Sequence, residues 1–115
     1  MDARPDPRQR PPVLRVVEPG ETVQVLTQAA GADLLLTDRR LVVASGERVA
    51  LDVAFPGLRR IQFDIERKRP ATLVIVPEDP MHEPQVLAVP PGQYDEITKV
   101  LAEVGRHLAA IREAS

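Results

Sequence analysis

The sequence has no cysteine and no tryptophan, and both absences exclude classes of site. Without cysteine the chain has neither a disulfide framework nor a thiolate metal site, so packing must stabilise its fold. Aromatic residues make up 3% of the chain and are limited to Phe55, Phe63 and Tyr94. Proteins that bind single-stranded nucleic acid stack bases on aromatic side chains in basic grooves, whereas this chain has a pI of about 5.7. We therefore expect no nucleic-acid partner.

Groups that commonly carry out catalysis are also scarce. His82 stands in a proline-rich loop and His107 on a predicted helix, and neither belongs to a His-x-x-x-His or Glu-x-x-His motif that would hold a metal. The six glycines stand singly, so there is no glycine-rich phosphate loop. These patterns predict two solvated surface histidines, no catalytic residue, no metal and no cofactor. We do not expect an enzyme.

Long hydrophobic runs are missing as well. The longest, at 33–37 and 73–77, are far too short to cross a bilayer. The first residues show no apolar core of the kind that a signal peptide needs. We therefore expect a cytoplasmic protein, and its Arg-, Pro- and Ala-rich, Lys-poor composition suggests a bacterial source.

The N-terminal segment Met1–Pro12 differs in composition from the rest of the chain. It holds four prolines and three arginines but no aliphatic residue larger than alanine apart from the first methionine. Such a segment cannot bury enough apolar surface to offset the entropy of ordering it, so we expect a flexible tail over residues 1–12. The remaining residues, 13–112, are of a length that usually forms one domain.

Between Val13 and Val89 the chain contains about seven short strand-like runs separated by turn residues. The first of them is Val13–Val17. All the connections are short, which favours neighbouring antiparallel strands because a parallel crossover needs a dozen or more residues. The pattern therefore predicts a mainly β fold, an antiparallel seven-stranded barrel or sandwich.

Individual strands differ in their predicted burial. The run Leu34-Leu35-Leu36 predicts a strand covered on both faces. Alternation is clearest at 49–55 and 61–65, and it places Val49 and Ile65 on the inward faces of their strands. These two strands should therefore each cover the core with one face.

A helix is predicted from Pro91 to Arg112. Proline is favoured at the first position of a helix, and the apolar residues that follow recur at spacings of three and four. This apolar stripe comprises Tyr94, Ile97, Leu101, Val104, Leu108 and Ile111. We expect it to pack over an open end of the barrel, with Val100 at its side, although a dimeric coiled coil is the alternative.

The segment Gly-Ala-Asp-Leu-Leu-Leu-Thr-Asp-Arg-Arg-Leu-Val-Val, residues 31–43, is followed by a hairpin and by the strand-like segment 58–65. This arrangement resembles bacterial pleckstrin-homology-like (PH-like) domains, close kin of GRAM domains. The resemblance implies a barrel capped by a single C-terminal helix, acting as a non-catalytic module that binds proteins, lipid headgroups or its own copies. Phosphoinositide-binding members typically carry basic residues at the first hairpin loop, but residues 28–32 have none. We therefore transfer no binding residue from the family.

Two groups of basic residues are candidates for contact with a ligand or partner. Arg67, Lys68 and Arg69 form the tip of a predicted hairpin. Arg39 and Arg40 follow Asp38 at a predicted turn, where they could bind phosphate. In the alternative interpretation both groups are structural: Asp38 would cap its own turn, and the arginines would brace the fold or face water.

Protein is the partner class that we expect first, including copies of the chain itself, which would make it a homo-oligomer. The expected function is thus protein–protein interaction or self-association. The alternative is peripheral binding to anionic lipid through the 67–69 tip. A third hypothesis is a small-molecule carrier or an enzyme with a pocket between the sheet and the helix.

Overall fold

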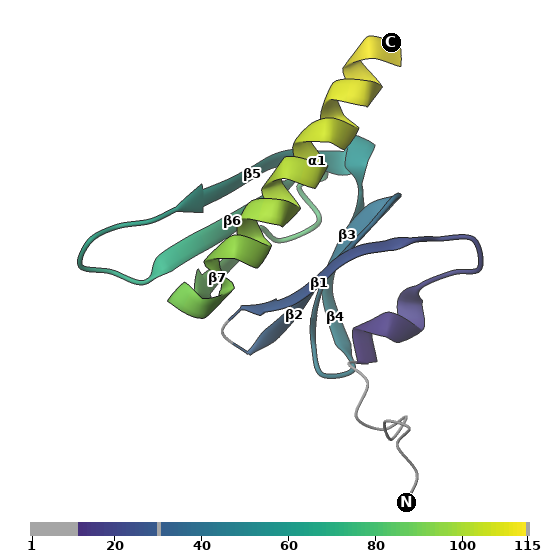
Figure 1. Ribbon diagram of the computed structural model, residues 1–115. Coiled ribbons are helices and arrows are strands. Elements are labelled where there is room, and N and C mark those ends of the chain that lie inside the picture. Colours follow the sequence, from purple (N-terminus) through teal and green to yellow (C-terminus); the bar gives the residue numbers. More distant parts are fainter. Residues whose placement is uncertain (1–11, 30, 115) are drawn as a thin grey trace, which may run out of the picture.

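The computed structural model describes residues 12–29 and 31–114 of the chain, and within them two antiparallel sheets pack with one long helix (Figure 1). The first sheet consists of β1 (Val23–Ala29), β2 (Ala32–Thr37), β3 (Arg40–Ser45) and β4 (Arg48–Ala54). The second consists of β5 (Leu58–Asp64), β6 (Ala71–Pro77) and β7 (Gln85–Val89). The helix is α1 (Tyr94–Ala114), and three short 3₁₀ helices are η2 (Pro12–Val16), η3 (Phe55–Gly57) and η4 (Pro91–Gln93). The predicted mainly β architecture with seven strands and a C-terminal helix is confirmed.

The middle strands of the first sheet are covered on both faces, as the leucine run predicted. Leu34 and Leu36 of β2 lie in the main core between the two sheets, while Leu35 faces a second, smaller cluster on the opposite side. That second cluster is closed by Val13 of η2, which packs against Leu35 and Val42. Burial on both faces explains why this stretch lacks the alternation of a half-exposed strand.

The strand predicted at Val13–Val17 is wrong, because this segment forms η2. Its apolar residues cover the first sheet and do not add a strand to it. Pro12 begins the element and has no backbone N–H to donate to a strand ladder. The predicted flexible tail, apart from Pro12, lies outside the described residues.

Two positions that the alternation placed inward are exposed, each because a strand departs from regular geometry. The pairing of β3 with β4 shifts register beside Val43 and Ala44, and this irregularity leaves Leu51 buried but Val49 exposed. In the second sheet, β5 ends at Asp64, so Ile65 has left the strand and is 60% exposed. Both inward assignments were therefore wrong.

Helix α1 packs against its own sheets, contacting β1, β5 and η3 (Figure 1). Its fully buried side chains are Ile97, Val100 and Val104. Val100, which we expected at the side of the stripe, is therefore at its centre, and Leu101 and Leu108 are only partly buried. The buried face of the helix is therefore centred on residues 97, 100 and 104, which are three and four positions apart. This face contacts both sheets, through β1 and β5.

We predict that shortening Ile97 destabilises the fold much more than the same change at the far end of the helix. Ile97 has none of its surface exposed, whereas Ile111 is 38% exposed. Ile97→Ala should lower the free energy of unfolding by about 2–5 kcal/mol, and Ile111→Ala by less than about 1 kcal/mol. Urea denaturation of the two variants measures the difference. Equal losses would show that the helix does not pack as described.

Candidate functional site

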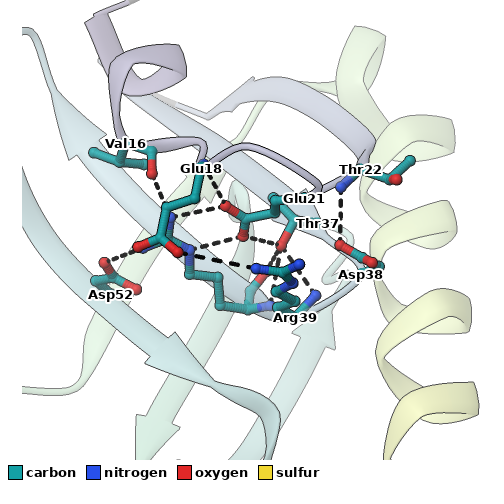
Figure 2. Close-up of polar contacts among 9 residues, drawn as sticks. Val16, Glu18, Glu21, Thr22, Thr37, Asp38, Arg39 and Asp52 are labelled. Carbon is teal, nitrogen blue, oxygen red and sulfur yellow. Dashed lines mark hydrogen bonds and ion pairs between the residues drawn. The ribbon is translucent and has the colours of Figure 1, made fainter.

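The Thr-Asp-Arg-Arg segment forms the turn between β2 and β3, and its centre is the Thr37 side chain (Figure 2). The Thr37 hydroxyl oxygen accepts hydrogen bonds from the backbone N–H groups of Arg39 and Arg40, each at 3.1 Å. The same hydroxyl donates to Glu21 Oε2 at 2.6 Å. Thr37 therefore caps this turn, the task that the sequence interpretation gave to Asp38.

Asp38 binds the segment that precedes β1 instead. Its Oδ1 accepts from the backbone N–H of Thr22 at 2.9 Å, and the Asp38 N–H donates to the Thr22 carbonyl at 3.0 Å. Arg39, next to it, is about half exposed and lies 3.9 Å from an exposed Glu18 carboxylate. Such a pair contributes little to stability, so Arg39 is held only loosely.

Arg40 makes hydrogen bonds and ion pairs with several segments of the protein. Its Nε lies 2.8 Å from Glu21 Oε2 and its Nη2 lies 2.9 Å from Glu21 Oε1, a bidentate pair. Its Nη1 donates to Asp52 Oδ2 of β4 at 2.7 Å, and Nη2 also donates to the Val16 carbonyl at the end of η2. Arg40 thus connects three separate segments, and four of its five N–H groups have partners within the protein.

The Glu21–Arg40 ion pair is largely buried, and it shifts the pKa values of both groups. The Glu21 side chain is 1% exposed and that of Arg40 is 16% exposed. Hydrogen bonds from Arg40 above all, together with those from the Thr37 hydroxyl and the Glu18 amide, lower the pKa of Glu21 from 4.5 to about 2, against the opposing effect of burial. The Glu21 carboxylate likewise raises the pKa of Arg40. Both groups are therefore charged throughout the physiological range.

The other predicted basic group lies at the far end of the second sheet. Arg67, Lys68 and Arg69 occupy the loop between β5 and β6, which projects from the rest of the molecule (Figure 1). Arg67 and Arg69 line a cavity of about 590 Å³, together with Glu66. Arg69 Nε lies 3.8 Å from Glu66 Oε2, and both side chains are exposed.

Apolar groups form the walls of this cavity, at the junction of β6, β7 and the start of α1. The residues concerned are Pro70, Ala88, Val89, Pro90, Pro91 and Tyr94. The Tyr94 ring is held edge-on against Phe63, with ring centroids 5.6 Å apart. A pocket therefore exists beside the sheet and the start of the helix, and two of the predicted arginines line it.

The outward face of the second sheet is apolar at its centre. Along β6 the residues Ala71, Leu73, Ile75 and Pro77 are buried, so Thr72, Val74 and Val76 point away from the core. Val74 pairs with Val86 of β7, which is 66% exposed. We call Thr72, Val74, Val76 and Val86 the outer apolar face.

Polar side chains border this face. On the β5 side Arg60 pairs with Val76, and Gln62 pairs with Val74. Arg59, Arg60 and Val76 together line a surface hollow of about 340 Å³. An apolar centre with arginines at its margin is the composition typical of protein interfaces.

The histidines have different surroundings. His82 is exposed, with its Nε2 3.9 Å from Asp79 Oδ2. His107 is not simply solvated, as we had expected: its ring stacks on Phe55 with centroids 4.1 Å apart, and its Nε2 lies 2.9 Å from Gln24 Oε1. This contact fastens α1 to η3 and β1, so His107 has a packing role.

Among the described residues, no group of three or more acidic or histidine side chains could hold a metal ion. In the same part of the chain, no helix combines the length and the apolar character needed to cross a membrane.

Glu21 and the cavity walls were missed by the sequence reasoning. Glu21 follows a Pro-Gly turn and resembles any solvated turn acid, because its partner Arg40 is 19 residues away. The cavity forms only when Pro70 and Pro91 are brought together by the pairing of β6 with β7. The pattern of neighbouring residues in the sequence therefore indicates neither the Glu21–Arg40 pair nor the cavity.

No protein-family model matches the chain, and no curated protein is significantly similar to it. Its structure is similar to the crystal structure of a pleckstrin homology domain from Shewanella amazonensis SB2B, with a TM-score of 0.59 and 14% sequence identity. The match covers 84% of this chain and 92% of that one. The chain therefore has a PH-like fold.

We predict that the Glu21–Arg40 pair makes stability depend on acid pH. Because the pKa of Glu21 is lower in the folded state, its contribution is complete above pH 4.5 and is lost as the pH falls toward 2. The loss should be about 3 kcal/mol. Urea denaturation at a series of pH values should show a steeper acid decline for the wild type than for Glu21→Gln.

Glu47→Gln is the matched control for this experiment. Glu47 pairs with Arg15 at 3.2 Å, but both side chains are more than two-thirds exposed. The control should therefore keep the wild-type acid profile. The assignment is wrong if Glu21→Gln and Glu47→Gln give the same profile.

Proposed function

We propose that this chain, with its PH-like fold, is a non-catalytic module that binds another protein or a second copy of itself through the outer apolar face. The observation that carries the proposal is the exposure of Val86, on the edge strand β7, beside Val74 on the central strand β6 of an open sheet. Antiparallel sheets that face water on one side normally carry polar residues there. An apolar centre on such a face is typical of an interaction site.

The edge of the sheet supports the same proposal. β7 is the last strand in the order β5–β6–β7, and it contains no charged residue. Natural proteins usually protect edge strands with charges, prolines or bulges against pairing with other chains. Although β1 contacts part of β7, an uncharged edge strand next to an apolar face suits docking of a protein segment.

The chemistry of the described residues favours binding over catalysis. Catalytic groups typically have perturbed pKa values and lie in a cleft. The pKa values of Glu21 and Arg40 are shifted, but these two groups satisfy each other in a structural network. The cavity at the 67–69 tip contains no histidine. We accordingly propose that the chain is not an enzyme.

We predict that a charge at Val86 disrupts the interaction. Val86→Lys should weaken self-association or partner binding at least tenfold, since loss of a central contact costs more than about 1.4 kcal/mol. Light scattering over a concentration series measures self-association. Binding of a purified partner, first captured by the wild type, is measured by calorimetry.

Val49→Lys is the control, because Val49 is also an exposed strand valine but belongs to the first sheet. Both variants should keep the wild-type melting temperature. Equal binding by the two variants would place the interface away from the outer apolar face.

Attachment to anionic membranes through the 67–69 tip is the second candidate function. The observation in its favour is Ile65, an exposed apolar side chain close in sequence to three cations. We rank it second because Asp64 and Glu66 flank Ile65 and the chain carries a net charge of −2. Those acids oppose attraction to an anionic surface.

We predict that anionic vesicles do not sediment the wild-type protein at physiological ionic strength. Each basic residue near an anionic surface contributes about 1 kcal/mol, and at physiological salt this attraction is screened within about 8 Å. Co-sedimentation with phosphatidylserine-containing and neutral vesicles measures the effect. Tight, salt-sensitive sedimentation that Arg67→Ser/Lys68→Ser/Arg69→Ser abolishes would make membrane attachment the leading function.

A further inference from the structure

The cavity beside the 67–69 tip combines two kinds of lining residue. Arg67 and Arg69 contribute charged side chains, and the rest of the lining is mostly proline, alanine and valine residues and Tyr94. At about 590 Å³, it falls within the range of pockets that hold small organic molecules. It lies apart from the Arg40 network, and its chemistry is not used by the proposed protein-binding face.

The charged side of the cavity is left with an excess of positive charge. Arg69 shares a long contact with Glu66, but in residues 12–29 and 31–114 no carboxylate lies within ion-pair distance of Arg67. The cavity is lined by three charged side chains, those of Glu66, Arg67 and Arg69, so their charges sum to +1. The planar guanidinium fork binds carboxylate and phosphate oxygens in particular.

The apolar side restricts what can accompany that anion. Pro70, Pro90 and Pro91 have no backbone N–H, so these wall residues offer no amide donors to a polar ligand. Val89 and the Tyr94 ring add further apolar surface. A small inorganic anion would leave this wall facing water, whereas an aliphatic or aromatic group would cover it.

We infer that the cavity binds a small organic anion, a carboxylate or phosphate monoester, whose apolar body lies on the proline and Tyr94 wall while its charged group meets Arg67 and Arg69. This site is separate from the protein-binding function proposed above and does not depend on it. It also differs from membrane attachment, because its ligand is a free monomer rather than a lipid surface.

Tyr94 provides a direct measurement of occupancy. It is the single tyrosine of the chain, and there is no tryptophan, so the intrinsic fluorescence of the full chain reports the cavity wall. Octanoate and octyl phosphate test the two anionic groups on the same apolar body. Octyltrimethylammonium tests charge, and acetate and inorganic phosphate test the need for the apolar body.

We expect octanoate, octyl phosphate or both to change Tyr94 fluorescence saturably at micromolar to millimolar concentration. The cation and the two short anions should bind at least tenfold more weakly. Arg67→Ser/Arg69→Ser should weaken binding of the octyl anions at least tenfold. Both arginine side chains are exposed, so this variant should fold, which its melting temperature will verify.

Arg59→Ser/Arg60→Ser is the matched control, since it removes two exposed arginines from the other end of the same hairpin. It should leave octyl-anion binding unchanged. The inference is overturned if neither octyl anion binds, if octyltrimethylammonium binds as well, or if the two double variants behave alike. It is also overturned if Tyr94 responds to anionic vesicles but not to monomeric anions, a result that would assign the tip to membrane attachment.

Discussion

The ion pair between Arg40 and Glu21 is the interaction on which the arrangement of the first sheet depends. One guanidinium holds the carboxylate that precedes β1, a carboxylate of β4 and the last carbonyl of η2. Without it, η2 would lose its buried polar attachment and keep the exposed Arg15–Glu47 pair, so that the position of Val13 over Leu35 would depend mainly on apolar contact. A buried pair of this kind adds little net stability over apolar packing, but removing one partner is costly. Its main effect is to fix which segments lie together.

The molecule uses its arginines in two ways. Arg40 forms ion pairs with buried and half-buried carboxylates and stabilises the fold. Arg67 and Arg69 line a cavity, where the long contact between Arg69 and Glu66 offsets only part of their positive charge. The two uses lie on different sheets. The middle strands of the first sheet are covered on both faces by η2 and the main core, while the second sheet has one face packed and one face open. For this reason we propose the second sheet and its hairpin tip, rather than β2 and β3, as binding surfaces.

The sequence predicted features that depend on local pattern and failed where distant segments decide. The leucine run of β2 and the spacing of the helix were enough to predict a strand buried on both faces and a packed C-terminal helix. The apolar segment 13–17 satisfied a strand pattern equally well, yet it forms a 3₁₀ helix because it covers a sheet that is already paired. Val49 was misplaced by an irregularity in the pairing of β3 with β4, which no pattern within β4 reveals. The basic tip was visible in the sequence, but the cavity behind it depends on strand pairing.

The central claim is that binding takes place on the outward side of the second sheet and not around the Arg39–Arg40 turn. Backbone amide spectra of isotope-labelled protein, recorded at increasing concentration of the chain and with a purified partner, test it most directly. The account predicts that signals from β6 and β7, including those of Val74 and Val86, shift while those of Thr37 to Arg40 stay in place. Shifts that gather on the first sheet around Arg39, with β6 and β7 unchanged, would contradict it.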